Sequence, residues 1–191
     1  MLDGENKVID AAIGGDSSAF GQLYDHYHGK IYRFVAVKVA TREEAEDITH
    51  QIFLNALQNL GGYKNIGLPF SSWLYRIARN QVIDYYRTRK MNIPLDTITQ
   101  EEEAGTSSKV GHKEIEGETQ MKLDMEAVMT AVRSLKQQYQ DVILLRFVED
   151  LSIQESAAIL QKTEGAVKVM QYRAMSELRK LLEGQKSIHE D

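Results

Sequence analysis

The sequence predicts an all-α protein in which a flexible acidic linker joins two small helical domains. Only two of the 191 residues are proline, and apolar residues recur three and four positions apart along most of the chain, as they do on the buried face of a helix. This spacing stops after Lys90 and resumes at Met121, and the stretch between them is polar and rich in acids. We therefore expect a domain at 1–91, a linker at 92–120 and a domain at 121–191.

Three helices are expected in the first domain, and two of them begin at recognisable caps. Asp16 can cap the first, and Thr41 with Glu44 has the spacing of a capping box at the start of the second. The pair Gly61–Gly62 offers the positive-φ residues that end the second helix, and the third covers about 70–90. The apolar stripes of the first two helices comprise Phe20, Leu23, Tyr24, Tyr27, Ile31, Phe34, Val35, Ala45, Ile48, Ile52, Phe53, Ala56 and Leu57.

Composition excludes several classes of protein. The chain has no cysteine, its five histidines lack the spacing of zinc ligands, and no apolar run approaches the roughly 20 residues that span a bilayer. The N-terminus shows no secretory signal, so we expect a cytoplasmic protein with no membrane insertion, no metal site and no cofactor. Neither a glycine-rich phosphate loop nor a Ser/His/Asp arrangement is recognisable, so we expect neither catalytic residues nor enzymatic activity.

The net charge of −5 is concentrated in the predicted linker. Residues 92–120 contain seven acidic and two basic side chains, which account for the whole net charge. The two predicted domains together are therefore neutral, and the acidity of the chain does not argue against nucleic-acid binding.

Residues 152–178 are predicted to form a helix-turn-helix. Ser152 and Thr163 can cap the two helices, and the small Ala157 lies where such helices cross closely. Four side chains of the second helix would face outward: Lys168, Gln171, Tyr172 and Arg173. Cations and amides of this kind bond guanine, adenine or phosphate in the major groove. An ordinary helical hairpin with a solvated basic face is the alternative, and the full residue spacing favours DNA binding.

The third predicted helix concentrates aromatic and cationic side chains. Between residues 73 and 90, five cations accompany a single acid. Steps of four, four and three residues place one polar stripe on this helix, made of Arg76, Asn80, Asp84 and Arg87. Cations beside aromatic rings suit an exposed single strand, because stacking contributes about 1 to 3 kcal/mol per base. Taken alone, however, packed aromatics beside a solvated rim are the more ordinary explanation.

The helix before it carries a second polar face with two explanations. This face comprises Asp47, Gln51, Leu54 and Asn55. These residues could form a surface that docks on another protein, or equally the solvent-exposed side of a helix. Periodicity alone does not separate the two.

The order of the motifs is more informative than any one of them. AEDITHQIF at 45–53 precedes FSSWLYRIARN at 70–80, and a linker and the helix-turn-helix follow. This order resembles the extracytoplasmic-function (ECF) group of bacterial RNA polymerase sigma factors, over about residues 16–182. The resemblance implies an alternative sigma factor that binds core RNA polymerase and directs promoter-specific transcription initiation.

The resemblance also implies a division of labour between the domains. Residues 1–91 would be the sigma region 2 domain, which docks on the clamp helices of the largest polymerase subunit and opens the minus-10 element. Residues 121–191 would be the region 4 domain, which reads the minus-35 duplex and contacts the flap of the other large subunit. An anti-sigma factor is a further partner that the resemblance implies.

Matching positions carry these roles to individual residues. Core binding falls to Asp47, Gln51, Leu54 and Asn55. Melting and minus-10 recognition fall to Trp73, Tyr75, Arg76, Asn80, Asp84 and Arg87. The minus-35 contacts fall to Lys168, Gln171, Tyr172 and Arg173. The loop at 61–69 matches one that helps to hold a flipped base, and the acidic linker either threads toward the RNA exit path or serves as a solubilising spacer.

Some positions depart from the family pattern. Gln161 stands where many such turns have glycine, which costs about 1 kcal/mol if the turn needs a positive φ. Ser156 replaces an apolar residue, and Ala166 and Val169 replace Thr and Ser of the recognition helix, so the minus-35 sequence is not predicted. The alternative function is a one-component helix-turn-helix regulator with an N-terminal helical sensor domain, although such a domain would more naturally show a hydrophobic pocket.

Overall fold

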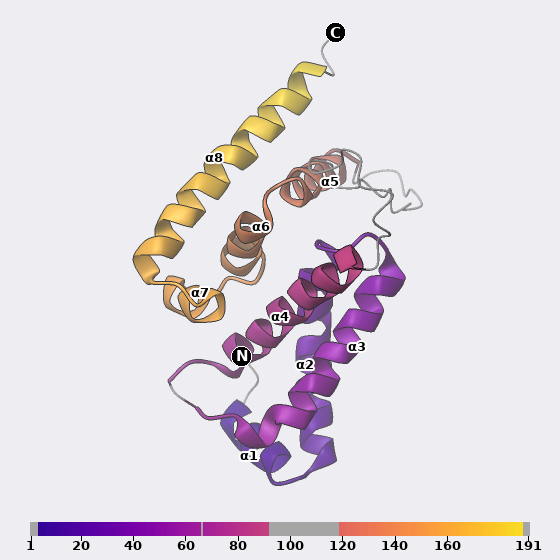
Figure 1. The fold of residues 1–191 in the computed structure, drawn as a ribbon, viewed down its shortest axis with the longest axis vertical. Helices are drawn as coiled ribbons and strands as arrows, with labels where there is room; N and C mark the ends of the chain where they lie inside the picture. The colour runs from indigo at the N-terminus through magenta and orange to yellow at the C-terminus, as the bar shows by residue number, and fades with distance from the viewer. Residues whose placement is uncertain (1–3, 66, 92–118, 189–191) are drawn as a thin grey trace. The chain divides into compact units, whose positions relative to one another are not determined.

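The computed structural model describes residues 4–65, 67–91 and 119–188 (Figure 1). Every regular element within these residues is a helix, which confirms the predicted all-α class. The chain divides into two compact units, Met1–Ile98 and Thr99–Asp191, called unit 1 and unit 2 below. The predicted linker lies outside the described residues except for its last two positions, where a helix has already begun.

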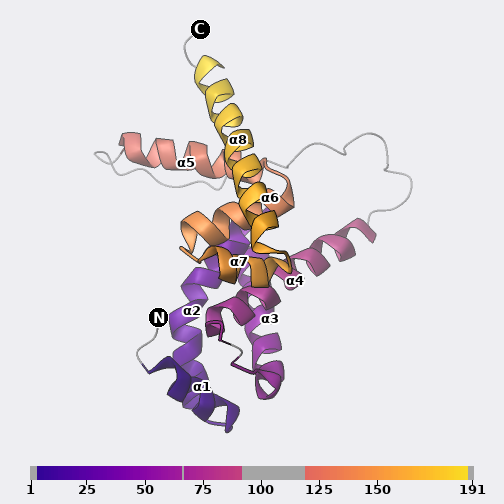
Figure 2. The ribbon, with the colours of Figure 1, turned by 90° about the vertical axis from the view of Figure 1, so that its left-hand side faces the viewer.

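Unit 1 is a bundle of four helices. They are α1 (Glu5–Ile13), α2 (Ser17–Ala36), α3 (Arg42–Asn59) and α4 (Phe70–Met91), with the 3-10 turn η1 (Leu60–Gly62) after α3. Figures 1 and 2 show α2, α3 and α4 alongside one another, and each of these helices contacts the other two. Their shared core includes Leu23, Ile31, Phe34, Val35, Ala45, Ile52, Ala56, Leu74, Tyr75, Ala78 and Val82.

Helix α1 is an element that the sequence did not predict. Its buried Glu5 accepts a hydrogen bond from the hydroxyl of Tyr27, which is itself buried in α2. Burial of the phenol is the largest cause that raises the pKa of Tyr27, and its bond to Glu5 is the second. The hydroxyl therefore remains a donor at neutral pH. The short helix is thus held to the bundle by a polar contact as well as by the burial of Ile9 and Ala12.

The predicted helix starts in unit 1 are confirmed. The Asp16 carboxylate accepts from the backbone amides of Ser18 at 2.8 Å and Ala19 at 3.3 Å. Thr41 and Glu44 form the reciprocal capping box, with distances of 3.1 and 3.0 Å.

The prediction that α3 ends through positive-φ glycines at 61 and 62 is wrong. Gly61 and Gly62 do not adopt positive φ, because α3 passes directly into the right-handed turn η1, which the buried Leu60 anchors. The positive φ occurs later in the loop, at Gly67, where φ is 81°. Leu57 was also predicted in the core and is 49% exposed.

Unit 2 contains the helix-turn-helix. Its elements are α5 (Thr119–Arg133), α6 (Gln137–Ile143), the π-helical turn η3 (Leu144–Val148), α7 (Ile153–Leu160) and α8 (Glu164–Ile188). Helix α8 packs on α5, α6 and α7, and Figure 2 shows α5 lying across it. Their core includes Ala131, Val132, Val142, Leu144, Leu145, Ala157, Ile159, Val167 and Ala174.

The turn between α7 and α8 has the geometry that the sequence indicated. Ser152 and Glu155 form a capping box at the start of α7, and the Thr163 hydroxyl accepts from the Ala166 amide at 3.2 Å at the start of α8. Gln161 adopts the left-handed conformation, with φ 54° and ψ 46°. The positive φ is therefore required, and a glutamine supplies it.

Within the described ranges, no helix is both long and apolar enough to cross a membrane.

Candidate nucleic-acid interface

A hollow of about 430 Å³ opens between α3 and α4 in unit 1. Its lining from the two helices comprises Asn55, Asn59, Trp73, Ile77, Asn80, Gln81 and Asp84. The α4 members are three or four positions apart, so they share one helix face. The structure therefore gathers Trp73, Asn80 and Asp84 from the predicted minus-10 group, and it adds Asn55 from the predicted core-binding group.

Side-chain amides connect the two walls of this hollow. Gln51 Nε2 donates to Asn55 Oδ1 at 3.1 Å, and Asn55 Nδ2 donates to Gln81 Oε1 at 2.8 Å. Asn59 Nδ2 donates to the backbone oxygen of Asn55 at 2.8 Å. Sequence reasoning missed Gln81, because its partner lies 26 positions away on another helix and no local spacing reveals it.

An aromatic cluster positions Trp73 at the edge of the hollow. The half-buried indole packs against Tyr63 and Phe70, with ring centroids 5.3 and 5.2 Å apart. Phe70 in turn contacts Tyr27 of α2 at 5.7 Å. The loop after η1 contributes Tyr63, so the loop predicted at 61–69 reaches the side of Trp73.

Tyr75, which was predicted in the same group as Trp73, does not belong to this surface. The residue is 1% exposed, and its ring packs edge-on against Phe34 at 5.5 Å in the core of unit 1. Positions two apart on a helix differ by about 200°, so Tyr75 faces away from Trp73. Trp73 and Tyr75 are two positions apart in the sequence motif but lie on different sides of α4.

The predicted cations on the polar stripe are exposed but do not line the hollow. Arg76 and Arg87 are both solvent-accessible, and Arg87 Nη2 lies 3.1 Å from Asp84 Oδ1. An ion pair this exposed stabilises a protein by about 0 to 1 kcal/mol. Arg87 can therefore exchange the Asp84 carboxylate for a phosphate at little cost in free energy.

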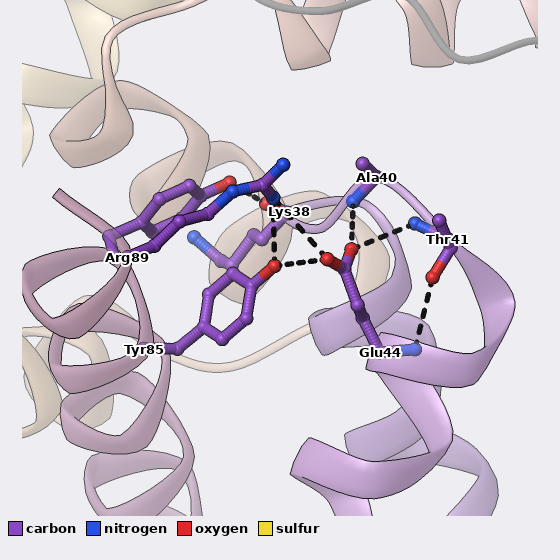
Figure 3. Close-up of polar contacts among 7 residues, drawn as sticks. Lys38, Ala40, Thr41, Glu44, Tyr85 and Arg89 are labelled. Atoms are coloured by element: carbon purple, nitrogen blue, oxygen red, sulfur yellow. Dashed lines mark hydrogen bonds and ion pairs between the residues drawn. The ribbon is translucent and has the colours of Figure 1, made fainter. Parts of the chain in front are cut away.

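The second half of α4 is fastened to the corner between α2 and α3 (Figure 3). The Glu44 carboxylate accepts from the backbone amides of Ala40 and Thr41, both at 3.0 Å, and from the Tyr85 hydroxyl. Arg89 Nη1 lies 3.3 Å from the same carboxylate and 2.9 Å from the Tyr85 oxygen. The carboxylate that caps α3 therefore also bonds α4 through Tyr85 and Arg89.

Electrostatics at Glu44 favour the charged form. Desolvation is the largest single influence and raises its pKa, but the bonds from Tyr85, Thr41 and Ala40 and the charge of Arg89 together lower the pKa of Glu44 below its usual value. Burial of the Tyr85 phenol is the largest cause that raises its pKa, and the bond to Glu44 is the second. At neutral pH the pair is therefore a phenol donating to a carboxylate.

The outer face of α3 presents the remaining predicted core-binding residues. Asp47 and Gln51 are exposed, Leu54 is 52% exposed, and Asn55 is half-buried at the hollow. Leu57 extends this face, so that two large apolar side chains lie beside polar ones. This face of α3 therefore combines polar groups with two exposed leucines.

Three of the four predicted minus-35 residues are outward on α8. Lys168 and Arg173 are exposed, and Tyr172 is 78% exposed. Gln171, the fourth predicted contact, is half-buried, and its Oε1 accepts from Arg146 Nε at 3.2 Å. Arg146, which lies in η3, also donates to the Leu151 carbonyl oxygen just before α7, so it joins Gln171 to this loop.

Both units match known families of protein. Residues 23–91 match sigma-70 region 2, and residues 125–178 match sigma-70 region 4. The chain is 33% identical to the ECF RNA polymerase sigma factor SigW of Bacillus subtilis, over 92% of the chain and 95% of SigW. It is 34% identical to the ECF RNA polymerase sigma factor BldN of Streptomyces coelicolor over 92% of its own length, but it spans only 65% of BldN.

Two solved structures share the fold. One is CnrH in complex with the cytosolic domain of CnrY, with a TM-score of 0.70, 22% identity, and coverage of 94% of this chain and 97% of that one. The other is the sigma factor RpoE with the anti-sigma factor NepR from Bartonella quintana, with a TM-score of 0.67, 21% identity, and coverage of 86% and 96%.

Proposed function

Since this chain belongs to the ECF group of RNA polymerase sigma factors, we propose that it binds core RNA polymerase and directs promoter-specific transcription initiation. The chemistry of RNA synthesis belongs to the polymerase, so the chain itself needs no catalytic residue. Such a protein works in the cytoplasm with the polymerase. A one-component regulator is not favoured, because residues 23–91 match a sigma region rather than a sensor domain.

The observation that carries the proposal for unit 1 is the hollow shared by α3 and α4. Its wall combines the half-buried Trp73 with the polar groups of Asn80 and Asp84. An aromatic ring beside amide and carboxylate groups offers stacking and edge contacts to an unpaired base. Arg76 and Arg87 lie nearby on the same helix and are suited to the phosphates of the opened strand. We assign minus-10 recognition and melting to this surface.

The minus-35 duplex is assigned to the helix-turn-helix of unit 2. In helix-turn-helix proteins the second helix of the motif lies in the major groove. Lys168 and Arg173 of α8 are exposed, and neither side chain makes a hydrogen bond or ion pair within the described part of the chain. Gln171 is omitted from the contacts because of its bond to Arg146.

Polymerase docking is assigned to the outer face of α3. Asp47, Gln51 and Leu54 provide charged, polar and apolar contacts for the clamp helices of the largest subunit. Unit 2 would contact the flap of the other large subunit. An anti-sigma factor is a further proposed partner, as NepR is for RpoE, and the exposed Leu54 and Leu57 suit a covering protein.

Runoff transcription with purified core polymerase tests the whole proposal. We expect the chain to yield discrete transcripts from a genomic promoter library, whereas core polymerase alone yields none. A folded chain that associates with core polymerase and still gives no promoter-specific transcript would contradict the proposal.

Two substitutions test the division of labour. Asn80→Ala should lower promoter opening about tenfold and be rescued on a template with a pre-opened minus-10 region, because a base contact contributes about 1 to 3 kcal/mol. Arg173→Ala should weaken duplex binding about tenfold without rescue by that template. Gln22→Ala on α2 and Arg133→Ala at the end of α5 are exposed controls. Losses from Asn80→Ala and Arg173→Ala that respond in the same way to the pre-opened template would contradict the division.

A further inference from the structure

The outward face of α8 has an apolar centre between two cations. Gly165, Val169 and Tyr172 fall within about 60° of one another around the helix, given about 100° per residue. Val169 is 49% exposed and Tyr172 is 78% exposed. Lys168 and Arg173, both exposed, lie on opposite flanks of this line, about 140° apart.

This arrangement matches the layout of a major groove. Phosphates border the groove on both sides, and the base edges form its floor. Cations on both flanks of the helix therefore complement the two backbones. The central residue then faces the floor, where the thymine methyl is the apolar group that a short aliphatic side chain can contact. Val169 is that central aliphatic residue, one turn into the helix.

Gly165 supports the same placement. It lies in the first turn of α8 with a helical rather than a positive φ, and a Cβ atom built on it would meet nothing within 4 Å. Neither the backbone nor the packing of unit 2 therefore requires glycine here, although glycine weakens a helix. The missing side chain would allow a partner to approach the start of α8 closely. Gly165 is four positions before Val169, so clearance at the glycine brings the valine nearer to that partner.

Building on the proposed function, we propose that Val169 reads the methyl group of a thymine in the minus-35 element and that Gly165 provides the clearance for this contact. Lys168 and Arg173 then bind the phosphates on either side instead of reading base edges. The occupant of this face is duplex DNA, whose phosphates the flanking positive charges favour. A protein partner covering Val169 is the competing occupant, and the experiment separates the two.

Selective removal of the methyl group tests the role of Val169. The minus-35 element is first selected from a randomised duplex with holoenzyme assembled from this chain and core polymerase. Each thymine of the selected element is then replaced by deoxyuridine, which lacks only the methyl group. At one position the wild-type holoenzyme should lose about fourfold in affinity, the effect of one buried carbon. The Val169→Ala holoenzyme should bind the thymine and deoxyuridine versions of that position equally well.

A matched pair of glycine substitutions tests the clearance. Gly165→Ala should lower affinity for the selected element about tenfold while the thermal stability of the chain stays the same or rises, because the added methyl meets no atom of the chain. Gly184→Ala places a methyl in equally open space further along α8, and it should leave the affinity unchanged.

Three results would overturn the inference. In the first, the Val169→Ala holoenzyme still distinguishes thymine from deoxyuridine. In the second, the Gly165→Ala holoenzyme binds with full affinity. In the third, Val169→Ala weakens binding equally on all sequences, as the loss of a protein contact would. In each case the wild-type holoenzyme still selects a minus-35 sequence, so the proposed function stands. If the wild-type holoenzyme selects no sequence at all, the proposed function fails, and the inference fails with it.

Discussion

Asn55 of α3 donates a hydrogen bond of 2.8 Å from its side-chain amide to the Oε1 atom of Gln81 on α4. Its own oxygen accepts from Gln51 at 3.1 Å, so both ends of the Asn55 amide are occupied. Gln51 lies on the face proposed to dock on polymerase, and Gln81 lines the hollow proposed to receive an opened base. The amide chain therefore links the two proposed surfaces of unit 1.

Asn55→Ala should lower the free energy of unfolding of unit 1 by about 1 kcal/mol, because Gln51 and Gln81 each lose a partner. Trp73 is the single tryptophan of the chain, so its fluorescence in urea reports the unfolding of unit 1. Gln58→Ala, an exposed change on the same helix, should have no such effect. Combining Asn55→Ala with Gln81→Ala should give a coupling free energy of at least about 0.5 kcal/mol, and strict additivity would contradict a direct bond.

Loss of the Glu44 cluster should make unit 1 less stable and alter its acid sensitivity. Tyr85→Phe removes a hydrogen bond to a charged carboxylate and should cost about 1.5 kcal/mol at pH 7, measured by tryptophan fluorescence in urea. The pKa of Glu44 is lower in the folded state, so its contribution to stability is complete above the ordinary value of 4.5 and is lost as the pH falls below it.

Unfolding midpoints between pH 7 and pH 3 test this direction. Glu44→Gln should be less stable than the wild type at pH 7 and should lose less stability on acidification. Glu43→Gln changes the neighbouring exposed carboxylate and should keep the wild-type pH profile. A Glu44→Gln profile parallel to that of the wild type would show that the carboxylate does not gain its charge stabilisation from this cluster.

Gln161→Gly should stabilise unit 2 by about 1 kcal/mol. Gln161 holds φ at 54°, a conformation that costs a residue with a Cβ atom but not glycine. Hydrogen exchange of the amides in α7 and α8 measures the gain, since the tryptophan reports only on unit 1. Gln161→Ala keeps the Cβ atom and should bring no gain. Equal protection in both variants would mean that the turn relaxes without strain.

Ser156→Ala should also stabilise unit 2, by about 1 kcal/mol. Ser156 is fully buried in α7, and its hydroxyl finds no hydrogen-bond partner in the described part of the chain. Removing an unsatisfied buried hydroxyl recovers its desolvation cost. Ser176→Ala, an exposed change on α8, controls for the better helix propensity of alanine. The same exchange measurement applies, and a gain no larger than that of the control would imply that the hydroxyl is solvated.

Local features of the fold could be predicted, because their causes lie within a few residues. The caps at Asp16, Thr41 and Ser152 depend on side chains two to three positions from the amides that they bind, and the left-handed turn at Gln161 depends on motif spacing. Periodicity likewise predicted the burial of Ile31 on α2 and the exposure of Arg173 on α8.

The features that were missed depend on distant partners. Helix α1 is held by a bond between Glu5 and Tyr27, and Gln171 accepts a bond from Arg146, 25 positions away. Leu57 was assigned to the apolar stripe of α3 but lies at its flank, about 100° around the helix from the buried Ala56, and is 49% exposed. Periodicity describes one helix at a time, so it contains no information about where a neighbouring helix ends.

The burial of Tyr75 affects how genetic data on this chain should be interpreted. A random mutant library scored only for loss of transcription would place alleles of Tyr75 beside alleles of Asn80, as if both had lost a promoter contact. Alleles of the core residue should instead lower the amount of protein in the cell, because unfolded chains are degraded, whereas alleles of the exposed residue should leave it unchanged. Immunoblots of each mutant strain would therefore sort the defects along α4 into folding and recognition.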